Sequence, residues 1–238
     1  RCVLVSSQAA AGPAAAADAP VREDDAPRPV EAYGESKLEA EREAMRQAGR
    51  VPIVIVRPGA VYGPRDRDFL RAFKQAASRI ALYASPREQA ISIVHVSDLV
   101  DGLIRSAELP GAVGRTYFLA NETPVTWSTI YRTVAEATGR MPVELDVPRG
   151  LIHAAAWACD AAGIVTGMTT LINRNKAAMI GPRWWICDSA RARKELGWVP
   201  QVPLQSGLCD TYHWYTRAAW MRGPKPSVAA RSPEEPEA

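Results

Sequence analysis

Tyr33-Gly34-Glu35-Ser36-Lys37 places a tyrosine and a lysine four residues apart in a segment with helical character. On a helix, residues i and i+4 lie on one face, so we expect the Tyr33 phenol and the Lys37 ammonium to point into the same space. A cation close to a tyrosine favours its phenolate form. The pair is therefore suited to general acid or base chemistry, provided that the flanking segments place it at a ligand site.

Two short apolar runs rich in β-forming residues flank this segment. The first covers residues 1–5 and stops at Ser6-Ser7, and the second covers residues 51–56 and stops at Arg57. Strand, helix and strand in this order predict a parallel sheet. Because ligands bind beyond the carboxyl ends of parallel strands, Ser7 and the turn that follows the second strand are expected at the same rim.

The stretch Pro58-Gly59-Ala60-Val61-Tyr62-Gly63-Pro64-Arg65 follows that second strand. Two prolines and two glycines this close together predict a turn, since neither a strand nor a helix accommodates them in its interior. From its neighbours alone, Arg65 is interpreted as a capping or surface arginine beside the acidic residues that follow it.

Local signals predict the remaining elements. The Tyr33 helix is expected to end near residue 48 at Gly49, with a solvated charged face that includes Glu41. Residues 8–30, rich in Ala, Pro and Asp, are expected to form a loop. Ser97 or Asp98 is expected to cap a helix, and His95 is interpreted as a hydrogen-bonded structural histidine rather than a catalytic one. Further elements are expected as helices over 66–78, 126–139, 190–196 and 204–220, strands over 116–119, 142–147 and 184–187, and a hairpin over about 80–94.

The composition narrows the function classes. The chain has 238 residues, is 47% hydrophobic and carries a formal charge of +3, so it can bury a sizeable core and shows no basic excess typical of nucleic-acid binding. Its four cysteines lie far apart without a Cys-x-x-Cys pair, which predicts neither a metal site nor a disulfide framework. A reducing cytoplasm fits this pattern.

The segment 151–172 is the most apolar part of the chain and has the length of a membrane span. Its histidine, its aspartate and its terminal threonines and glycines favour a buried or pocket-lining helix instead, so membrane association is not expected. Residues 223–238, rich in Pro, Glu and Ser, are expected to be disordered.

Four motifs in one order resemble a known family. VLVSSQAAAG (3–12), YGESK (33–37), VRPGAVYGPRD (56–66) and HVSDL (95–99) are similar to the extended short-chain dehydrogenase/reductase family, the NAD-dependent epimerase/dehydratase group. The resemblance covers residues 1 to about 200. It implies an α/β fold, namely the C-terminal part of a Rossmann-type doubly wound parallel sheet plus a smaller mixed α/β substrate-binding domain.

The resemblance also implies roles for individual residues. Ser7, Tyr33 and Lys37 would be catalytic, with Tyr33 and Lys37 also contacting NAD or NADP. Ser7 is preferred to Ser6 because it keeps the family's spacing to Gly12. Further cofactor contacts would come from Pro58, Gly59, Ala60 and Val61, and substrate contacts from Ser7, Arg65 and Asn173.

No Gly-x-Gly-x-x-Gly turn or close variant occurs in the chain. The resemblance therefore implies that the first strands and the glycine-rich turn lie upstream of Arg1, and that this chain alone binds NAD(P) weakly. Within it we expect a catalytic part over 1–120, a substrate-binding part over 121–222 and a tail over 223–238. The open edge of the first strand predicts self-association, with a homodimer as one form.

The expected substrate is a small molecule, and its class stays open. The apolar segment 151–172 slightly favours a sterol-like or flavonol-like substrate. A nucleotide sugar is the alternative, because Arg174, Lys176 and Arg183 could neutralise a diphosphate. A third interpretation is a binding or regulatory module that uses the same fold without turnover.

Overall fold

The computed structural model describes residues 1–221, except residues 79, 140, 149, 152–153, 155–156 and 158–179. Its elements are β1 (Cys2–Val5), α1 (Gln8–Ala11), α2 (Ala32–Arg46), β2 (Ile53–Pro58), β3 (Ala60–Tyr62), α3 (Asp68–Ala76), β4 (Ile80–Tyr83), β5 (Ala90–Ile91), β6 (Ile93–His95), α4 (Val96–Glu108), η1 (Pro110–Ala112), β7 (Thr116–Leu119), β8 (Val125–Thr126), α5 (Trp127–Thr138), β9 (Val143–Asp146), β10 (Trp184–Trp185), α8 (Ala190–Leu196) and α9 (Leu204–Arg217). The predicted tail over 223–238 lies outside the described residues, as does most of the apolar segment 151–172.

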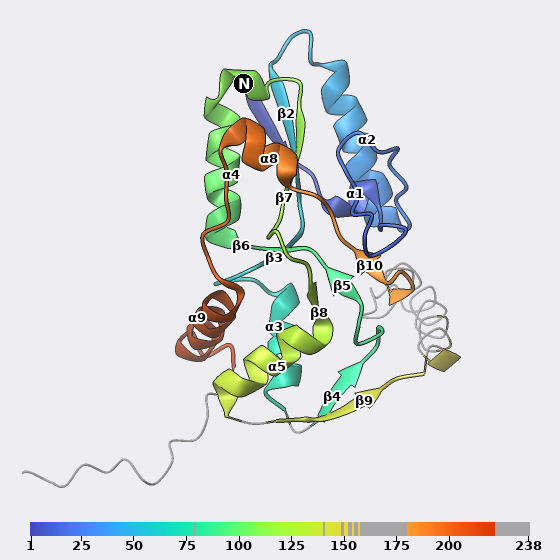
Figure 1. Ribbon diagram of the computed structural model, residues 1–238, viewed down its shortest axis with the longest axis vertical. Coiled ribbons are helices and arrows are strands. Elements are labelled where there is room, and N and C mark those ends of the chain that lie inside the picture. Colours follow the sequence, from blue (N-terminus) through green and yellow to red (C-terminus); the bar gives the residue numbers. More distant parts are fainter. Residues whose placement is uncertain are drawn as a thin grey trace, which may run out of the picture.

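A three-stranded parallel sheet in the order β1-β2-β7 forms the upper half of the molecule (Figure 1). Helices α1 and α2 lie on one side of this sheet, and α4 and α8 lie on the other. The middle strand is buried along its whole length, with Val54 and Val56 fully inaccessible. A continuous apolar strand covered by helices on both faces is typical of parallel sheets, so the predicted α/β class is confirmed.

The lower half packs helices α3, α5 and α9 around one apolar cluster (Figure 1). The largest fully buried side chains of this cluster are Tyr62, Tyr215, Phe73, Ile93, Ile130 and Leu208. The predicted helices over 126–139 and 204–220 are confirmed as α5 and α9. The division of the chain at residue 120 into two domains stays a prediction.

The hairpin predicted over residues 80–94 does not form. β4 pairs in parallel with β9, whereas β5 pairs with β8 and β10. Each strand is only two to four residues long, and so short a strand carries no local signal for its partner. Long-range packing decided the pairing.

The stretch predicted as one continuous turn over 58–65 contains a strand. Pro58 ends β2, and Ala60–Tyr62 forms β3, which pairs in parallel with β6. Gly59 allows this change of partner because an added Cβ at this position would lie 2.6 Å from the Ser92 backbone oxygen. Proline and glycine therefore mark a switch between two sheets here rather than a chain reversal.

Three smaller predictions also need correction. Residues 8–11, expected in a loop, form the short helix α1. Helix α2, which carries Tyr33, ends at the C-cap Gln47 rather than at Gly49. His95 caps α4 through Nδ1, which accepts the backbone N–H of Ser97, so neither Ser97 nor Asp98 is the cap. Helix ends fray, and a shift of one or two residues at a cap is common.

The loop that follows α1 contacts the outer edge of β7. The Glu23 carboxylate accepts the backbone N–H of Phe118 at 3.0 Å, and Arg191 of α8 lies 3.6 Å from the same carboxylate. Burial raises the pKa of Glu23 above its ordinary value, although the Phe118 N–H and the Arg191 charge oppose that shift. The Glu23 side chain thus supplies one of the hydrogen bonds that a further strand would make with β7.

The other edge of the sheet is open among the described residues. Cys2 N–H and Ser6 N–H donate to carbonyl groups of the β2 segment, so alternation directs the amides of Val3 and Val5 away from β2. No described strand pairs with that side of β1. An exposed row of backbone donors and acceptors is a template for pairing with another chain.

We therefore expect the 238-residue chain to self-associate through β1. Val5→Pro removes an edge N–H without removing a ladder bond to β2, so it should lower the apparent mass. Light scattering over a concentration series under reducing conditions measures this, with Val30→Ala as a control for loss of an exposed valine. A wild-type chain that stays monomeric at high concentration contradicts the prediction.

Candidate active site

Helix α2 brings Tyr33 and Lys37 together. Glu31 caps the helix by accepting the backbone N–H groups of Tyr33 at 2.7 Å and Gly34 at 2.6 Å. The Lys37 ammonium lies 5.7 Å from the centroid of the Tyr33 ring. The expected shared face is thus present, and the anchored first turn holds the tyrosine at the start of the helix.

Both side chains lie at the carboxyl end of β1. Lys37 Nζ donates to the backbone oxygen of Val5 at 3.3 Å. Tyr33 is 51% exposed. Its hydroxyl has no hydrogen-bond partner within the described part of the chain. The phenol is therefore available to a ligand beyond this strand end, where the ligands of parallel sheets bind.

Ser6 and Ser7 face opposite ways, as alternation at a strand end predicts. Ser6 is buried and its hydroxyl donates to Glu41 at 2.5 Å. Ser7 is half-buried and caps α1, because its hydroxyl oxygen accepts the backbone N–H of Ala9 at 3.2 Å. Ser7 keeps its own hydroxyl hydrogen for a ligand, whereas that of Ser6 is engaged inside the protein.

The segment Pro58–Val61 spans the end of β2 and the start of β3 at the same rim. Gly59 N–H donates to Leu119 O at 3.0 Å, and Ala60 N–H donates to Ser92 O at 2.8 Å. Both amides are thus satisfied within the protein. The segment can offer a cofactor a shaped backbone surface, but these two N–H groups are already in use.

Two further predicted substrate contacts are less well placed. Arg65 is exposed in the turn between β3 and α3, and its φ of 72° lies in the left-handed region that few non-glycine residues adopt. The neighbouring Asp66 uses its carboxylate to accept the Asp68 and Phe69 N–H groups. Asn173 lies outside the described residues.

His95 is a hydrogen-bonded structural residue. Its Nδ1 lies 2.7 Å from the Ser97 hydroxyl, and its ring contacts Tyr62 edge-on with centroids 5.3 Å apart. Burial lowers the pKa of His95, while the charges of Asp98 and Asp210 act in the opposite direction. These contacts confirm that His95 is hydrogen-bonded, and its lack of a catalytic role stays a prediction.

A charged group that no motif indicated lies behind the site. Glu41, expected on the solvated face of α2, is buried and pairs with the buried Arg57 of β2 at 2.6 Å. One signal was available, because Tyr33, Lys37 and Glu41 follow each other at intervals of four and so share a helix face.

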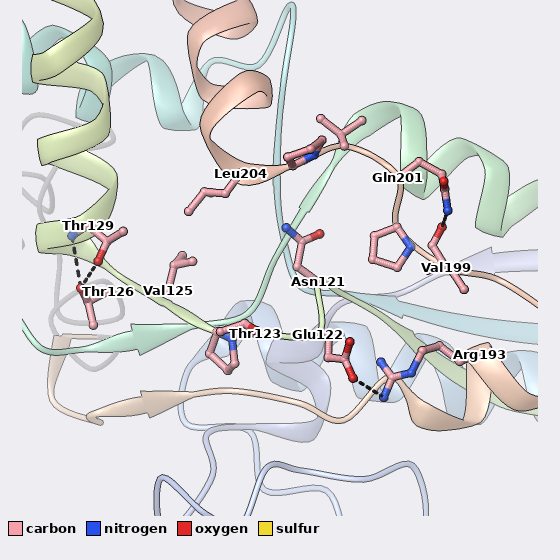
Figure 2. A pocket seen from close by; sticks show the side chains of 14 residues that line it. Asn121, Glu122, Thr123, Val125, Thr126, Thr129, Arg193, Val199, Gln201 and Leu204 are labelled. Atoms are coloured by element: carbon pink, nitrogen blue, oxygen red, sulfur yellow. Dashed lines mark hydrogen bonds and ion pairs between the residues drawn. The ribbon is translucent and has the colours of Figure 1, made fainter.

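A separate pocket has a volume of about 630 Å³, and Figure 2 shows the side chains that line it. Its walls come from the segment after β7, the start of α5, and the connection between α8 and α9. Asn121, Arg193 and Leu204 contribute to these walls, and none of the candidate catalytic residues does. The buried Asn121 Oδ1 has no partner in the described part of the chain. The chemistry of Tyr33 and Lys37 is therefore not served by this pocket.

The donor set of the candidate site suits one end of a dinucleotide. An ammonium and a phenol at a strand end can bind ribose hydroxyls, so the described residues fit a nicotinamide riboside group. Among residues 1–221 as described, no group of His, Cys, Asp and Glu side chains could hold a metal ion, and no helix is long and apolar enough to span a bilayer.

Comparison with known proteins identifies a family. Residues 1–120 match the family model described as NAD dependent epimerase/dehydratase family. UDP-glucose 4-epimerase of Vibrio cholerae is 25% identical over 222 residues, which cover 92% of this chain and 64% of that protein. Ceramide reductase of Caulobacter vibrioides is 28% identical over 233 residues, which cover 96% of this chain and 66% of that protein. This chain thus spans slightly less than two thirds of both relatives.

Solved structures show the same fold. UDP-glucuronic acid 4-epimerase from Bacillus cereus, in complex with UDP-glucuronic acid and NAD, aligns with a TM-score of 0.71 at 20% identity, covering 91% of this chain and 61% of that one. RMD from Pseudomonas aeruginosa, complexed with NADPH, aligns with a TM-score of 0.71 at 17% identity. The alignment covers 90% of this chain and 66% of that one. At these identities the likeness establishes the arrangement of helices and strands.

Proposed function

The chain belongs to the NAD dependent epimerase/dehydratase family, and from this premise we propose that the whole protein is an NAD(P)-dependent oxidoreductase of the extended short-chain dehydrogenase/reductase type. One observation carries the proposal. Tyr33 and Lys37 share a face of α2 at the carboxyl end of β1, where the Ser7 hydroxyl also lies. A phenol, an ammonium and a hydroxyl at this rim are the groups that carbinol or carbonyl chemistry needs.

The proposed roles follow from the contacts of each group. Tyr33 takes the proton from a substrate hydroxyl, or returns it to a carbonyl oxygen. Lys37 stabilises negative charge on the Tyr33 oxygen and binds the nicotinamide ribose, and Ser7 positions the reacting substrate oxygen with its free hydroxyl hydrogen. The Pro58–Val61 segment and Arg65 complete the rim toward the cofactor and the substrate. NAD or NADP, when bound, supplies the hydride acceptor or donor.

An apolar alcohol or ketone is the favoured substrate class. The similarity to a ceramide reductase supports it, as does a sterol-4-alpha-carboxylate 3-dehydrogenase of Saccharomyces cerevisiae that is 23% identical over 203 residues, covering 78% of this chain and 57% of that protein. The apolar sequence over 151–172 points the same way.

A nucleotide sugar is the second candidate, favoured by the similarity to UDP-glucose 4-epimerase. Its diphosphate needs cations. Arg183 is exposed in the structure, whereas Arg174 and Lys176 lie outside the described residues. A non-catalytic module of the same fold is the candidate of another class, and the Ser7, Tyr33 and Lys37 set argues against it because binding alone does not require a proton carrier.

Two assays on the protein expressed from its complete gene separate these candidates. We expect NAD- or NADP-dependent oxidation of a hydroxysterol or of a long-chain lipid alcohol, followed by the absorbance of the reduced nicotinamide. UDP-glucose is the parallel substrate, followed by chromatography because an epimerase gives no net reduction. Epimerised sugar without lipid oxidation selects the second candidate. Ligand binding without turnover in either assay selects the non-catalytic module.

A further inference from the structure

Three polar side chains, Ser6, Glu41 and Arg57, form a buried cluster next to the candidate active site. Arg57 donates to both carboxylate oxygens of Glu41, from Nε at 2.9 Å and from Nη2 at 2.6 Å. Ser6 Oγ donates to the same carboxylate at 2.5 Å. The side chains of Arg57 and Glu41 are 6% and 5% exposed, so solvent screens this ion pair little. We call these three residues the buried clamp.

The buried clamp joins the three segments that carry the candidate site residues. Ser6 directly precedes Ser7 at the end of β1, and Arg57 directly precedes Pro58 at the end of β2. Glu41 stands one helical turn after Lys37 on α2. Successive turns of one helix therefore contact successive residues of one strand end, since Lys37 Nζ binds Val5 O and Glu41 binds Ser6 Oγ.

The other buried contacts of α2 are less directional than the clamp. Gly34 lies flat against α1, where an added Cβ would come within 2.4 Å of Ala9 O, and Leu38 is a single buried aliphatic side chain. Small and apolar contacts resist separation of the helix but oppose sliding only weakly. A bidentate Arg–carboxylate pair has a fixed planar geometry and so defines one position.

The composition of the cluster also indicates a role in geometry rather than in stability. Desolvation of two charges offsets much of their attraction, and a well-packed apolar pair is often as stable. Arg57 Nη1 is buried and has no partner within the described residues, so the cluster is not even fully satisfied. Arg57 also lies over the Phe118 ring of β7 at 5.7 Å, which ties the clamp to the central sheet.

We propose that the buried clamp is a positioning unit: Glu41, held by Arg57 and Ser6, sets the height of α2 against β1 and β2 and so holds Tyr33 and Lys37 opposite Ser7. This inference rests on the proposed function for the chemistry that it serves. A helix advances 1.5 Å per residue, so a shift of less than one residue displaces the phenol by an amount that costs about 10²-fold in rate.

The test replaces the ion pair by apolar side chains of similar length. The double variant Glu41→Met/Arg57→Met keeps the volume of the cluster and removes its directional bonds. Its matched control is Glu39→Met/Arg42→Met, which removes a solvent-exposed pair from the same helix, with side chains 58% and 61% exposed. Denaturant unfolding establishes that each variant is folded before anything else is compared.

Two measurements then test whether the buried clamp positions α2. Hydrogen exchange measured by mass spectrometry over residues 31–38 is expected to speed up several-fold in the clamp variant relative to both the wild type and the control. In the protein expressed from its complete gene, kcat is expected to fall about 10²-fold with a much smaller change in KM. Should the double variant fail to fold, Ser6→Ala removes one arm of the clamp and is expected to shift both readouts in the same direction by a smaller factor.

Unchanged exchange over residues 31–38, or an equal change in the control, overturns the inference. Faster exchange with unchanged kcat overturns it as well, because the clamp would then hold the helix without serving the chemistry. If the wild type shows no NAD(P)-dependent turnover, the proposed function fails on its own, and exchange alone decides whether the clamp positions α2.

Discussion

Tyr33→Phe is expected to lower kcat by about 10²- to 10⁴-fold, which removes nearly all turnover, while leaving cofactor affinity nearly unchanged. The substitution deletes only the hydroxyl that carries the proton. The aromatic ring beside Lys37 stays in place, and the Glu31 bonds that cap α2 are backbone contacts that a phenylalanine keeps. Steady-state kinetics together with a nicotinamide cofactor titration measure both quantities, on the protein expressed from its complete gene.

The order of effects among the three site residues is the sharper comparison. Lys37→Ala should lower turnover and weaken cofactor binding together, because Lys37 serves both. Ser7→Ala should be milder than Tyr33→Phe, since a positioning hydrogen bond contributes about 0.5–1.5 kcal/mol. Ser36→Ala, at an exposed position on the same helix, is the control and should change neither quantity.

A Tyr33→Phe variant that keeps more activity than Ser7→Ala would contradict the assignment of Tyr33 as the proton carrier. The proton would then travel through another group. His95 is the first to examine, although its Nδ1 is engaged with Ser97 and burial lowers its pKa.

Asp98→Ala is expected to lower the free energy of unfolding by about 3–5 kcal/mol, which is a large part of the stability of an ordinary domain. The buried Asp98 carboxylate accepts the backbone N–H groups of Gln201 at 3.0 Å and Val202 at 3.1 Å. Alanine leaves both donors without a partner and frees the connection between α8 and α9. Hydrogen bonds to a charged group contribute about 1.5–3 kcal/mol each.

The matched control for Asp98 lies on the same helix. Asp101 is roughly half-exposed and pairs with Arg105 at 2.7 Å, so Asp101→Ala should cost only about 0.3–0.5 kcal/mol. Asp98→Asn keeps one acceptor oxygen, so its loss in the free energy of unfolding should lie between those of Asp98→Ala and Asp101→Ala. Urea unfolding of all three variants measures the series, and equal small losses for Asp98→Ala and Asp101→Ala would show that the carboxylate does not hold this connection.

Local signals were sufficient for much of the fold. Strands at both ends of the Tyr33 helix follow from runs of β-branched residues, and they pair in parallel as expected. Gly139 and Gly197 end α5 and α8 in the left-handed conformation that glycine favours. The facing of Tyr33 and Lys37 follows from helical spacing alone. Apart from the pairing of β1 with β2, which joins residues far apart in the chain, each of these properties depends on residues within one or two turns of each other.

The amino-acid sequence by itself therefore determined the strand, helix and strand unit, the family and the side chains that share the rim of the sheet. Only the tertiary structure decided which strands pair beyond that unit, because β3 to β6 are too short to carry a register of their own. It also decided that Glu41 is buried and Asp98 binds a distant turn. A charged residue on a helix is exposed or buried according to what packs against it, and for Glu41 that partner, Arg57, comes from the next strand of the sheet.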